Sequence, residues 1–461
     1  MKLACIGPLS PGRTGVAGFT ESLLPYLRQR CEVHLFTDRR SSGGLAAARR
    51  FPVEDISVFL SNPSAYDAAL YNMGNHYRFH KRVFEALTRV PSMALLHDCV
   101  LNQFFAKYTL ERGDFGAFSR LVQLCWPNVS SGDVAQFMSM KGDPYRFPMA
   151  GVVAACSRGT IVMTEYGRSI VLKEAPRANV LKVNFPYFPI DSGRTQTAGL
   201  SAETQSESAQ AFREKFGIPA RCFVVASVGH MTPAKRIDVA LEAFRKFNAK
   251  FPESVFLLSG EVSPRFPLAR SIERGNFKNV KYLGYLARSE LDGLMEIADV
   301  CVNLRYPSNG EMSASLIEML GRGKLVAVSN YAQFAEFPDP TCVKIDIGPS
   351  ESLDLADTLM RLVSDANRRH VIGLAARDYI SRNHSPEAAA DAIVSFAGKQ
   401  SRSEPLLPPE EVGRLLKPDN LLIRFRQMAA YNAKRLRVYR QEQGIAETIR
   451  QTLRRVSAGT Q

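Results

Sequence analysis

The sequence predicts an α/β protein made of two doubly wound domains, each with a parallel sheet and crossover helices. Short apolar stretches of strand length alternate with helical periodicity along most of the chain. A single small and polar stretch at 191–210 interrupts this alternation and is typical of an interdomain linker. The length of 461 residues, with 45% hydrophobic residues, suffices for a full core in each of two large units.

The first half, residues 1–190, is expected to form an N-terminal Rossmann-like domain. Its first strand ends at Gly7-Pro8, and a helical pattern through Phe19, Leu23 and Leu27 follows a turn-rich loop. Strands are expected at Lys2–Ile6, Glu32–Phe36, Asp67–Tyr71, His80–Leu87, Ser92–Leu96 and Gly151–Ala155. An aromatic-rich insertion at 103–148 is expected to be mostly the core of extra helices, although its rings could instead line an acceptor site.

The second half, residues 211–385, repeats the alternation and is expected to form the C-terminal Rossmann-like domain. The expected strands are Cys222–Val228, Val255–Ser259, Val280–Leu283, Val300–Leu304, Val326–Ser329 and Cys342–Ile345. Helices are expected at Ile237–Phe247, Glu290–Ile297 and Ser313–Leu320, with a closing helix over 386–400. Two such halves predict a deep cleft between them, at the carboxyl ends of both sheets.

The charge is concentrated in one segment. The chain carries 59 basic and 45 acidic residues, a formal charge of +14, and the segment from Arg414 to Arg455 alone holds a balance of +8. This basic tail, residues 401–461, is predicted to form an amphipathic helical extension, which could contact an acidic membrane, brace a domain or mediate oligomerisation. The chain lacks interleaved basic and aromatic residues of the kind found in RNA-binding modules, which disfavours a nucleic-acid partner.

Cysteine usage and hydropathy favour a cytoplasmic protein. The 8 cysteines are scattered singly, without the pairs or nearby histidines of a zinc site, so no metal is expected. No apolar run approaches a membrane span, and the apolar stretch before Pro8 is too short for a signal peptide.

Two motifs in the first half follow predicted strands. The glycine-rich loop from Gly7 to Gly18 includes Gly15 and could bring backbone N–H groups to an anion, or it could be an ordinary turn. Because it departs from the pattern G-x-G-x-x-G, a nicotinamide dinucleotide site is disfavoured. His97-Asp98 follows the strand ending at Leu96 and could hydrogen-bond sugar hydroxyls or transfer protons, the alternative being a helix cap.

Two further motifs lie in the second half. Lys235 and Arg236 precede a helix and suit a diphosphate, although surface cations there are often only solvated. In the stretch from Leu304 to Leu320, a strand end, a turn and a helix with small first-turn residues present N–H groups to a phosphate. Its two acids, Glu311 and Glu318, could bind a sugar and a ribose, or simply cap and cover the helix.

Taken together, Gly7-Pro8-Leu9…Gly15-Val16-Ala17, Leu96-His97-Asp98, Val228-Gly229…Lys235 and Gly310-Glu311…Glu318-Met319-Leu320 resemble the retaining glycosyltransferases of family 4, which have the GT-B fold. The resemblance covers about residues 1–395 and implies retaining transfer of a hexose from a nucleotide diphosphate sugar to a glycan or lipid-linked acceptor. It implies that neither a metal nor a further cofactor takes part. The expected setting is polysaccharide or lipopolysaccharide biosynthesis, in the cytoplasm or peripherally on the inner face of the cell membrane.

The resemblance also implies roles for individual residues. Gly15 would donate its N–H to the donor phosphate, His97 would contact the transferred sugar, and Lys235 would hold the diphosphate. Glu311 would bind the sugar hydroxyls and Glu318 the ribose, so that His97 and Glu311 are the expected catalytic residues. The remaining expected donor-binding residues are His230, Arg236, Arg305, Ser313, Ala314 and Ser315.

The chain departs from the family pattern at two positions. Six residues separate Glu311 from Glu318 instead of seven, so Gly310 stands where the first acid is expected. His230 follows Gly229 where the family usually has arginine, and we hypothesise that Arg236 or Arg305 supplies the missing cation. The alternative functions are a nucleotide-sugar epimerase or a phosphorylase of the same fold, and a non-catalytic scaffold.

Overall fold

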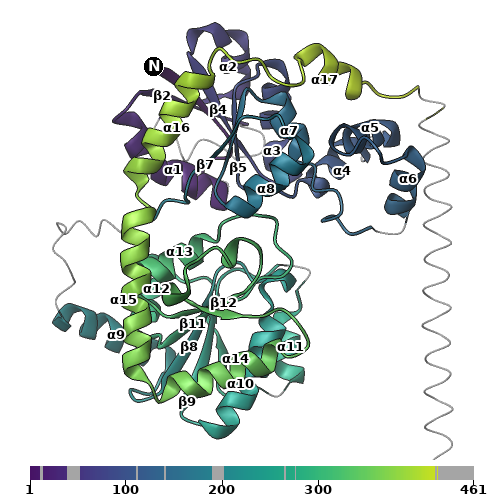
Figure 1. Cartoon of the computed structure of the whole chain (residues 1–461). Coiled ribbons are helices and arrows are strands. Elements are labelled where there is room, and N and C mark those ends of the chain that lie inside the picture. The colour runs from purple at the N-terminus through teal and green to yellow at the C-terminus, as the bar shows by residue number, and fades with distance from the viewer. Residues whose placement is uncertain are drawn as a thin grey trace, which may run out of the picture. The chain divides into compact units, whose positions relative to one another are not determined.

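The computed structural model describes residues 1–10, 14–38, 52–110, 113–139, 142–188, 202–263, 266–275, 277–420 and 423. The chain divides into two compact units (Figure 1). Unit 1 comprises Met1–Val162, Gly167–Lys182 and Ile393–Gln461, and unit 2 comprises Met163–Tyr166 and Val183–Ala392. Among the described residues, no helix is long and apolar enough to cross a membrane.

Within the described residues, unit 1 is built on a sheet of seven parallel strands in the order β3-β2-β1-β4-β5-β6-β7. The strands are β1 Lys2–Ile6, β2 Glu32–Thr37, β3 Val53–Asp55, β4 Ala68–Met73, β5 Met93–Leu96, β6 Gly159–Val162 and β7 Val180–Lys182. Every residue of β4, β5 and β6 is buried, as expected for central parallel strands covered by helices on both faces.

The helices of unit 1 come from the crossovers, the insertion and the end of the chain. They are α1 Gly15–Arg28, α2 Ile56–Ser61, α3 Tyr77–Arg89, α4 Asn102–Leu110, α5 Phe115–Cys125, α6 Ser131–Ser139, α7 Ala150–Cys156, α8 Glu165–Glu174, α16 Pro386–Gln400 and α17 Pro409–Leu415, with a short 3₁₀ turn at Pro63–Ala65. The first two residues of α8 and the first part of α16 are assigned to unit 2.

Unit 2 repeats the topology, with six parallel strands in its described part in the order β10-β9-β8-β11-β12-β13. The strands are β8 Phe223–Val228, β9 Ser254–Ser259, β10 Val280–Tyr282, β11 Val300–Asn303, β12 Val326–Ser329 and β13 Val343–Ile345. In both units the order reverses between the first and the fourth strand, which is the Rossmann-like arrangement that the sequence predicts.

The helices of unit 2 are α9 Ala202–Phe216, α10 Ile237–Lys250, α11 Leu268–Arg274, α12 Arg288–Ile297, α13 Ala314–Gly321, α14 Glu351–Val363 and α15 Ala366–Asn383, with 3₁₀ turns at Pro233–Lys235, Ala332–Phe334 and Asp339–Thr341. Right-handed crossovers before and after the reversal place their helices on opposite faces of the sheet. On one face α10 packs against α14, and their apolar residues join a core that includes Phe244, Phe256 and Leu359.

Two predicted strands are helices in the structure, so these expectations were wrong. His80–Leu87 lies within α3, whose buried residues His80, Val83, Phe84 and Leu87 recur at helical spacing. Gly151–Ala155 lies within α7, whose seven residues are all buried and therefore carry no periodicity that separates helix from strand. The strand of this region is β6, which begins at Gly159.

The expected linker is shorter than its composition suggests, because α9 begins at Ala202, inside the polar stretch 191–210. Residues such as Glu, Gln and Ala are adequate helix formers even where they cannot fill a core. The C-terminal turns of α9 carry buried Phe212, whose ring lies against Gly293 of α12.

The aromatic insertion is core, as the sequence analysis favours. Phe104, Phe105, Phe118, Phe137 and Phe147 are at most 6% exposed and join one apolar cluster with α3 and α7. Rings enclosed in this way contribute stability through their packing. These five rings therefore do not line an open acceptor site.

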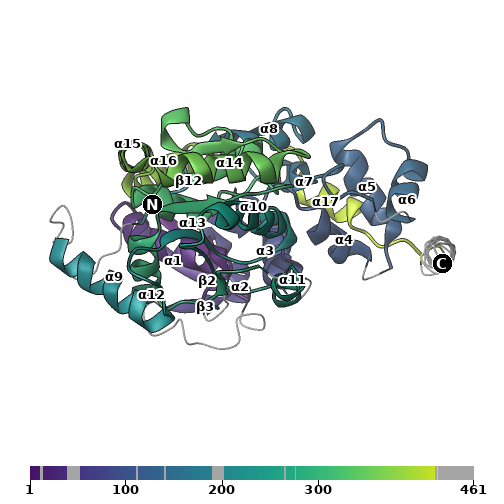
Figure 2. The same cartoon turned by 90° about the horizontal axis from the view of Figure 1, so that it is seen from below.

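The segment after α16 returns to unit 1. Leu407 and Val412 are buried in its core, and the Leu407 N–H donates to the Ala155 carbonyl at 2.8 Å. The Arg120 guanidinium of α5 donates to the Leu415 and Lys417 carbonyls and to the Asp419 carboxylate. Figures 1 and 2 both show α17 beside the helices of the insertion. Most of the predicted basic tail helix lies outside the described residues.

Candidate functional site

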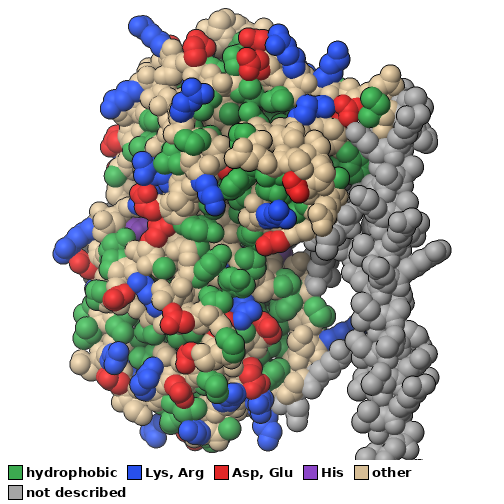
Figure 3. Space-filling model, turned by 45° about the vertical axis from the view of Figure 1, so that its right-hand side comes forward, with side chains coloured by type: hydrophobic (Ala, Val, Ile, Leu, Met, Phe, Trp, Pro, Cys, Tyr) green, Lys and Arg blue, Asp and Glu red, His purple; other side chains and the backbone are tan. Residues whose placement is uncertain are grey.

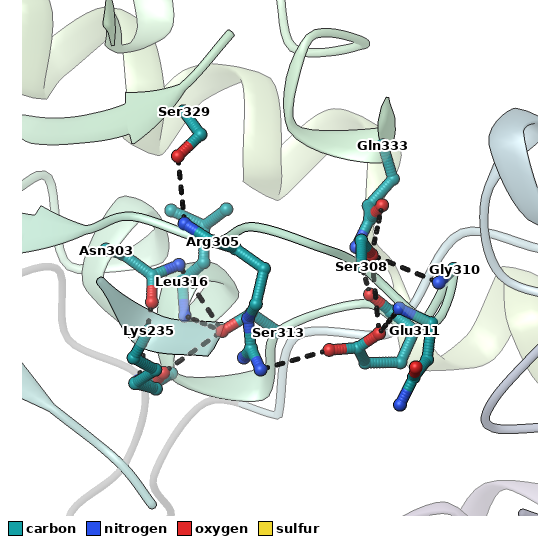
Figure 4. A network of polar contacts seen from close by, with 12 residues as sticks. Lys235, Asn303, Arg305, Ser308, Gly310, Glu311, Ser313, Leu316, Ser329 and Gln333 are labelled. Carbon is teal, nitrogen blue, oxygen red and sulfur yellow. Dashed lines mark hydrogen bonds and ion pairs between the residues drawn. The ribbon is translucent and has the colours of Figure 1, made fainter. Parts of the chain in front are cut away.

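In unit 2 Lys235, Arg305, Glu311 and the start of α13 gather where the strand order reverses. β8 and β11 are hydrogen-bonded neighbours, and their following loops lead to crossovers on opposite faces of the sheet. Such a reversal leaves a crevice at the carboxyl ends of the strands, where α/β proteins generally bind ligands. Lys235 comes from the loop after β8, whereas Arg305, Glu311 and Ser313 come from the loop after β11 (Figure 4).

Lys235 is the most constrained of these residues. It is only 4% exposed, and its ammonium donates to the Val228 carbonyl at 2.6 Å, with the Asn303 Oδ1 at 3.5 Å. Burial and, to a smaller extent, the neighbouring Arg305 charge outweigh the opposing effect of Glu311 and lower the pKa of Lys235 to about 7. The amine is therefore only partly protonated near neutral pH and would gain charge beside an anion.

Two glycines make room for this amine. Gly229 has φ +113°, and a Cβ there would lie 2.8 Å from Lys235 Nζ and 3.3 Å from Ser315 Oγ. Gly260 has φ +137°, and a Cβ there would lie 2.1 Å from the Gly229 carbonyl oxygen. Both positions therefore need glycine for backbone conformation and for space, and together they hold the β8 loop against the start of α13.

Arg305 and Glu311 form an ion pair beside Lys235. Arg305 Nη1 lies 3.2 Å from Glu311 Oε1, and the Arg305 N–H donates to Ser329 Oγ at 2.8 Å. Both side chains are mostly buried, at 16% and 20% exposed. Within the described part of the chain, Arg305 Nε is buried without a hydrogen-bond partner, so this guanidinium retains a donor for a further acceptor.

The turn that carries Glu311 is held by two buried polar side chains. Ser308 Oγ donates to Gln333 Oε1 at 2.8 Å and accepts from the Gly310 N–H at 3.0 Å, while Gln333 Nε2 donates to the Glu311 carbonyl at 2.6 Å. Gly310 has φ +77°, a conformation that an acidic residue would adopt only with strain. The carboxylate therefore comes from Glu311, one residue later than in the family pattern, and its Oε2 accepts from the Asn309 N–H.

The N-terminus of α13 completes this cluster. Ser313 caps the helix by accepting from the Leu316 N–H, and Asn303 Nδ2 donates to the same hydroxyl at 3.4 Å. Ser315 Oγ lies 3.1 Å from Ser313 Oγ, and Ala314 is exposed. The N–H groups of Ala314 and Ser315 belong to the first turn, where backbone donors have no partner within the helix and favour an anion.

Two predicted donor-binding residues, His230 and Arg236, lie apart from this cluster. His230 is exposed on the β8 loop. Arg236 adopts the left-handed conformation at φ +52°, and its guanidinium binds the buried Glu351 carboxylate of α14 and lies 6.0 Å from the Tyr306 ring. Since Arg236 is committed to a buried carboxylate, Arg305 is the better placed of the two cations proposed to compensate for His230.

Glu318 lies in a charge network that the sequence analysis did not foresee. Its Oε1 accepts from Arg288 at 2.7 Å and from Arg322 at 2.5 Å, and Arg322 also binds Asp292 at 2.5 Å. The spacing of Glu318 and Arg322, one helical turn apart, could have indicated their pairing. Asn303, Ser308 and Gln333 were also missed, since isolated polar residues that belong to no motif carry no sequence signal.

Unit 1 carries two predicted site residues, Gly15 and His97. Gly15 is the first residue of α1, exposed, and a Cβ there would have no atom within 4 Å. His97 follows β5, but its partner is Asn72 rather than Asp98: His97 Nε2 lies 3.0 Å from Asn72 Oδ1, and Asp98 accepts from the Asn75 N–H at 2.8 Å. Burial, with His80 nearby, lowers the pKa of His97 to about 3.

Comparison with known proteins agrees with this architecture. Residues 208–379 match the family model described as glycosyl transferases group 1. Residues 208–379 form a glycosyl transferases group 1 domain. A curated relative, the alpha-monoglucosyldiacylglycerol synthase of Acholeplasma laidlawii, is 29% identical over 124 residues, which cover 27% of this chain and 31% of the relative.

Solved structures resemble more of the chain at lower identity. Alr3699/HepE of Anabaena in complex with UDP and glucose covers 87% of this chain and 100% of its own, with 17% identity and a TM-score of 0.60. WaaG, a glycosyltransferase involved in lipopolysaccharide biosynthesis, covers 85% of this chain and 99% of its own, with 16% identity and a TM-score of 0.57. The chain therefore has the GT-B fold.

The lowered pKa of Lys235 predicts a pH-dependent stabilisation by Lys235→Met. The charged amine opposes folding fully below its folded pKa of about 7, and this cost disappears as pH rises toward 10.5, where the unfolded lysine is also neutral. Methionine should raise the free energy of unfolding by about 2 kcal/mol near pH 6.5 and by less near pH 10. Urea denaturation at both pH values measures this, with exposed Lys250→Met as a control; an equal gain at both would contradict the assignment.

Proposed function

We propose that this chain is a glycosyltransferase that moves a hexose from a nucleotide diphosphate sugar to a glycan or lipid-linked acceptor with retention of configuration. One observation carries the proposal: Lys235, Arg305 and the start of α13 converge at the strand reversal of a glycosyl transferases group 1 domain. Cations and backbone donors meeting at such a point suit a diphosphate better than any neutral ligand.

The diphosphate is proposed to bind three groups that differ in chemistry. The Lys235 amine would become fully protonated beside the anion, because a nearby negative charge raises the pKa that burial has lowered. Arg305 would offer Nε, which is buried without a protein acceptor in the described residues. The N–H groups of Ala314 and Ser315 would add fixed donors that need no reorganisation.

The two acids are proposed to bind the sugar and the ribose. Glu311 is held by Arg305 and by the Asn309 N–H, so its carboxylate is oriented to accept hydrogen bonds from sugar hydroxyl groups. Glu318 directs Oε1 at two arginines, which leaves Oε2 for a ribose hydroxyl. From unit 1, Gly15 would donate its N–H to the donor phosphate, and His97 would contact the transferred sugar.

The proposed reaction breaks the bond between the anomeric carbon and the diphosphate oxygen. The acceptor oxygen forms its new bond on the face that the diphosphate leaves, and the departing phosphate takes the acceptor proton. Charge accumulates on the leaving diphosphate, so its stabilisation by Lys235, Arg305 and the helix N-terminus would be the main catalytic contribution. No metal or further cofactor is invoked in this scheme.

The names of similar proteins support a choice of candidates. The Anabaena structure contains UDP and glucose, which makes UDP-hexoses the first donors to test. The Acholeplasma relative is named for a glucosylated diacylglycerol, and WaaG for lipopolysaccharide biosynthesis, which makes lipid-linked glycans candidate acceptors.

The transfer itself is tested by a donor screen followed by product analysis. UDP-, GDP- and ADP-hexoses are screened by thermal shift, because a ligand of the folded state raises the melting temperature. We expect at least one donor to bind. With a cell extract that contains glycan and lipid-linked acceptors, we expect NMR to show a product with the same anomeric configuration as the donor. An inverted product would refute retention, isomerisation without acceptor would indicate an epimerase, and no binding would indicate a scaffold.

The cation at the diphosphate is tested by two arginine variants. Arg305→Ala should weaken sugar-nucleotide binding about tenfold to a hundredfold, because a charge-assisted hydrogen bond contributes about 1.5–3 kcal/mol. The double variant Arg236→Met with Glu351→Gln removes the other guanidinium without leaving its buried carboxylate unpaired, and should change affinity less than about threefold. Calorimetric titration measures both; the opposite ranking would assign the role to Arg236.

We also propose that the basic tail holds the enzyme on the inner face of an acidic membrane. The balance of +8 from Arg414 to Arg455 and the glucosylated lipid in the relative's name support this. By contrast, acidic and basic side chains are interspersed on the face of the described residues seen in Figure 3. The segment from Arg414 to Arg455 thus differs from the body in its large excess of basic over acidic residues.

A truncation tests the membrane proposal, and the fold determines where to cut. Ending the chain near Pro405 would remove Leu407 and Val412 from the core, so the chain should end after Asn420, which keeps the Arg120 contacts. The full chain should sediment with phosphatidylglycerol vesicles at low salt, whereas the shortened chain and phosphatidylcholine vesicles should show little binding. Equal sedimentation of both chains would refute the proposal.

A further inference from the structure

The strand reversal of unit 1 holds a buried polar cluster around Asn72. This residue belongs to β4, is 1% exposed, and lies between β1 and β5 in the sheet. Gly7, directly after β1, packs so closely that a Cβ there would lie 2.8 Å from Asn72 Cβ. The Asn72 side chain is therefore enclosed on one side by backbone, and it faces His97 on the other.

The surroundings of Asn72 decide which way its amide points. Nδ2 lies 3.5 Å from the Ile6 carbonyl oxygen and 3.6 Å from Cys5 Sγ, and a carbonyl oxygen can only accept a hydrogen bond. The NH₂ group must therefore face β1. The carbonyl Oδ1 then faces His97 Nε2 at 3.0 Å, so Nε2 carries the hydrogen and donates it.

The His97 ring is neutral, so this hydrogen bond fixes its tautomer. Burial, with a smaller contribution from the nearby His80, lowers the pKa of His97 to about 3. His80 itself is buried and donates from Nδ1 to the Asn72 carbonyl, with its pKa lowered to about 4. A neutral imidazole with hydrogen on Nε2 has a lone pair on Nδ1, which can only accept.

The orientation of the ring is fixed by two further contacts. Phe19 of α1 packs edge-on against the ring at 4.9 Å between centroids. The backbone N–H of His97 donates to the Met73 carbonyl at 2.8 Å, which anchors the backbone that carries the ring. Among the described residues, the Asn72 contact is the only hydrogen bond of the His97 ring, and 9% of the residue stays exposed. Nδ1 is thus an acceptor of fixed direction that receives no hydrogen bond from the described part of the chain.

We propose that Asn72 is a positioning residue that holds His97 as the Nε2–H tautomer, so that Nδ1 accepts a hydrogen bond from a hydroxyl of the transferred sugar. This rests on the proposed glycosyl transfer, since it assigns the sugar contact of that same reaction. The consequence is specificity for donors with a hydroxyl at that point. A sugar that lacks it would leave the acceptor unpaired, and a carboxylate there would be repelled by the lone pair.

The tautomer is tested first, without any substrate. In protein labelled with ¹⁵N-histidine, with His97→Gln to assign the signal, we expect the wild-type His97 at pH 7 to be neutral with hydrogen on Nε2. Asn72→Asp keeps the size of the side chain but presents a carboxylate, which favours the charged imidazole with hydrogen on both nitrogens. A wild-type signal from the Nδ1–H tautomer or the charged ring would overturn the proposal.

The sugar contact is tested with donors in which each hydroxyl in turn is replaced by fluorine. In the wild type, one replacement should lower kcat/KM about tenfold, and in His97→Ala that penalty should disappear. Asn72→Asp should lose activity at pH 7 and regain part of it as pH rises and the imidazole loses its extra proton. Asn72→Leu, which removes the acceptor but not the bulk, should lose the fluorine penalty at every pH.

The outcomes separate this inference from the proposed function. If the wild type transfers sugar, but its fluorine penalties are the same in His97→Ala and Asn72→Leu, the positioning role is wrong and the function stands. If no donor is bound or used, the proposed function fails and the sugar contact fails with it. Melting temperatures of the variants, compared with His80→Gln as a second disturbance of the same cluster, show whether a loss of activity is a loss of folding.

Discussion

The burial of the Lys235 amine at the end of β8 is the constraint on which the site of unit 2 depends. An amine can be buried only if an acceptor meets it, and here the acceptor is the carbonyl of Val228, at the end of the same strand. This contact draws the loop back over the sheet, which in turn requires glycine at 229 and 260. The same geometry brings the Ser315 hydroxyl of α13 close, so one buried charge aligns two loops and a helix.

The two units share one topology, but the polar cluster at the strand reversal is charged in unit 2 and neutral in unit 1. Each sheet reverses its strand order between its first and fourth strands, and each reversal holds a buried polar cluster. In unit 2 the cluster is ionic, with Lys235, Arg305 and Glu311 in mutual contact or close by. In unit 1 it consists of two neutral histidines and an amide. The fold provides the position, and the side chains decide whether it attracts charge or orients a hydroxyl.

The sequence predicted the architecture better than the interactions. Strands such as β8 and β11 and helices such as α10 follow from alternation and periodicity, and their order implied where Lys235 and Glu311 would meet. The all-buried α7 lacked such a pattern, and α3 was misassigned although its buried residues recur at helical spacing. The partners were beyond reach: the binding of Arg236 to Glu351 and of His97 to Asn72 joins residues far apart in sequence. The local sequence around a residue does not indicate which distant residue will neutralise its charge or accept its hydrogen bond.

Unit 1 is discontinuous, since its core includes Leu407 and Val412 from a segment made after the whole of unit 2. During synthesis the ribosome therefore releases every strand of unit 1 long before the residues that complete its core. Until those residues have been made, the apolar surface of unit 1 that Leu407 and Val412 cover stays exposed. The contacts of Arg120 with residues 415–419 likewise form only after that segment has been made, so unit 1 depends on residues from both sides of unit 2 in the sequence.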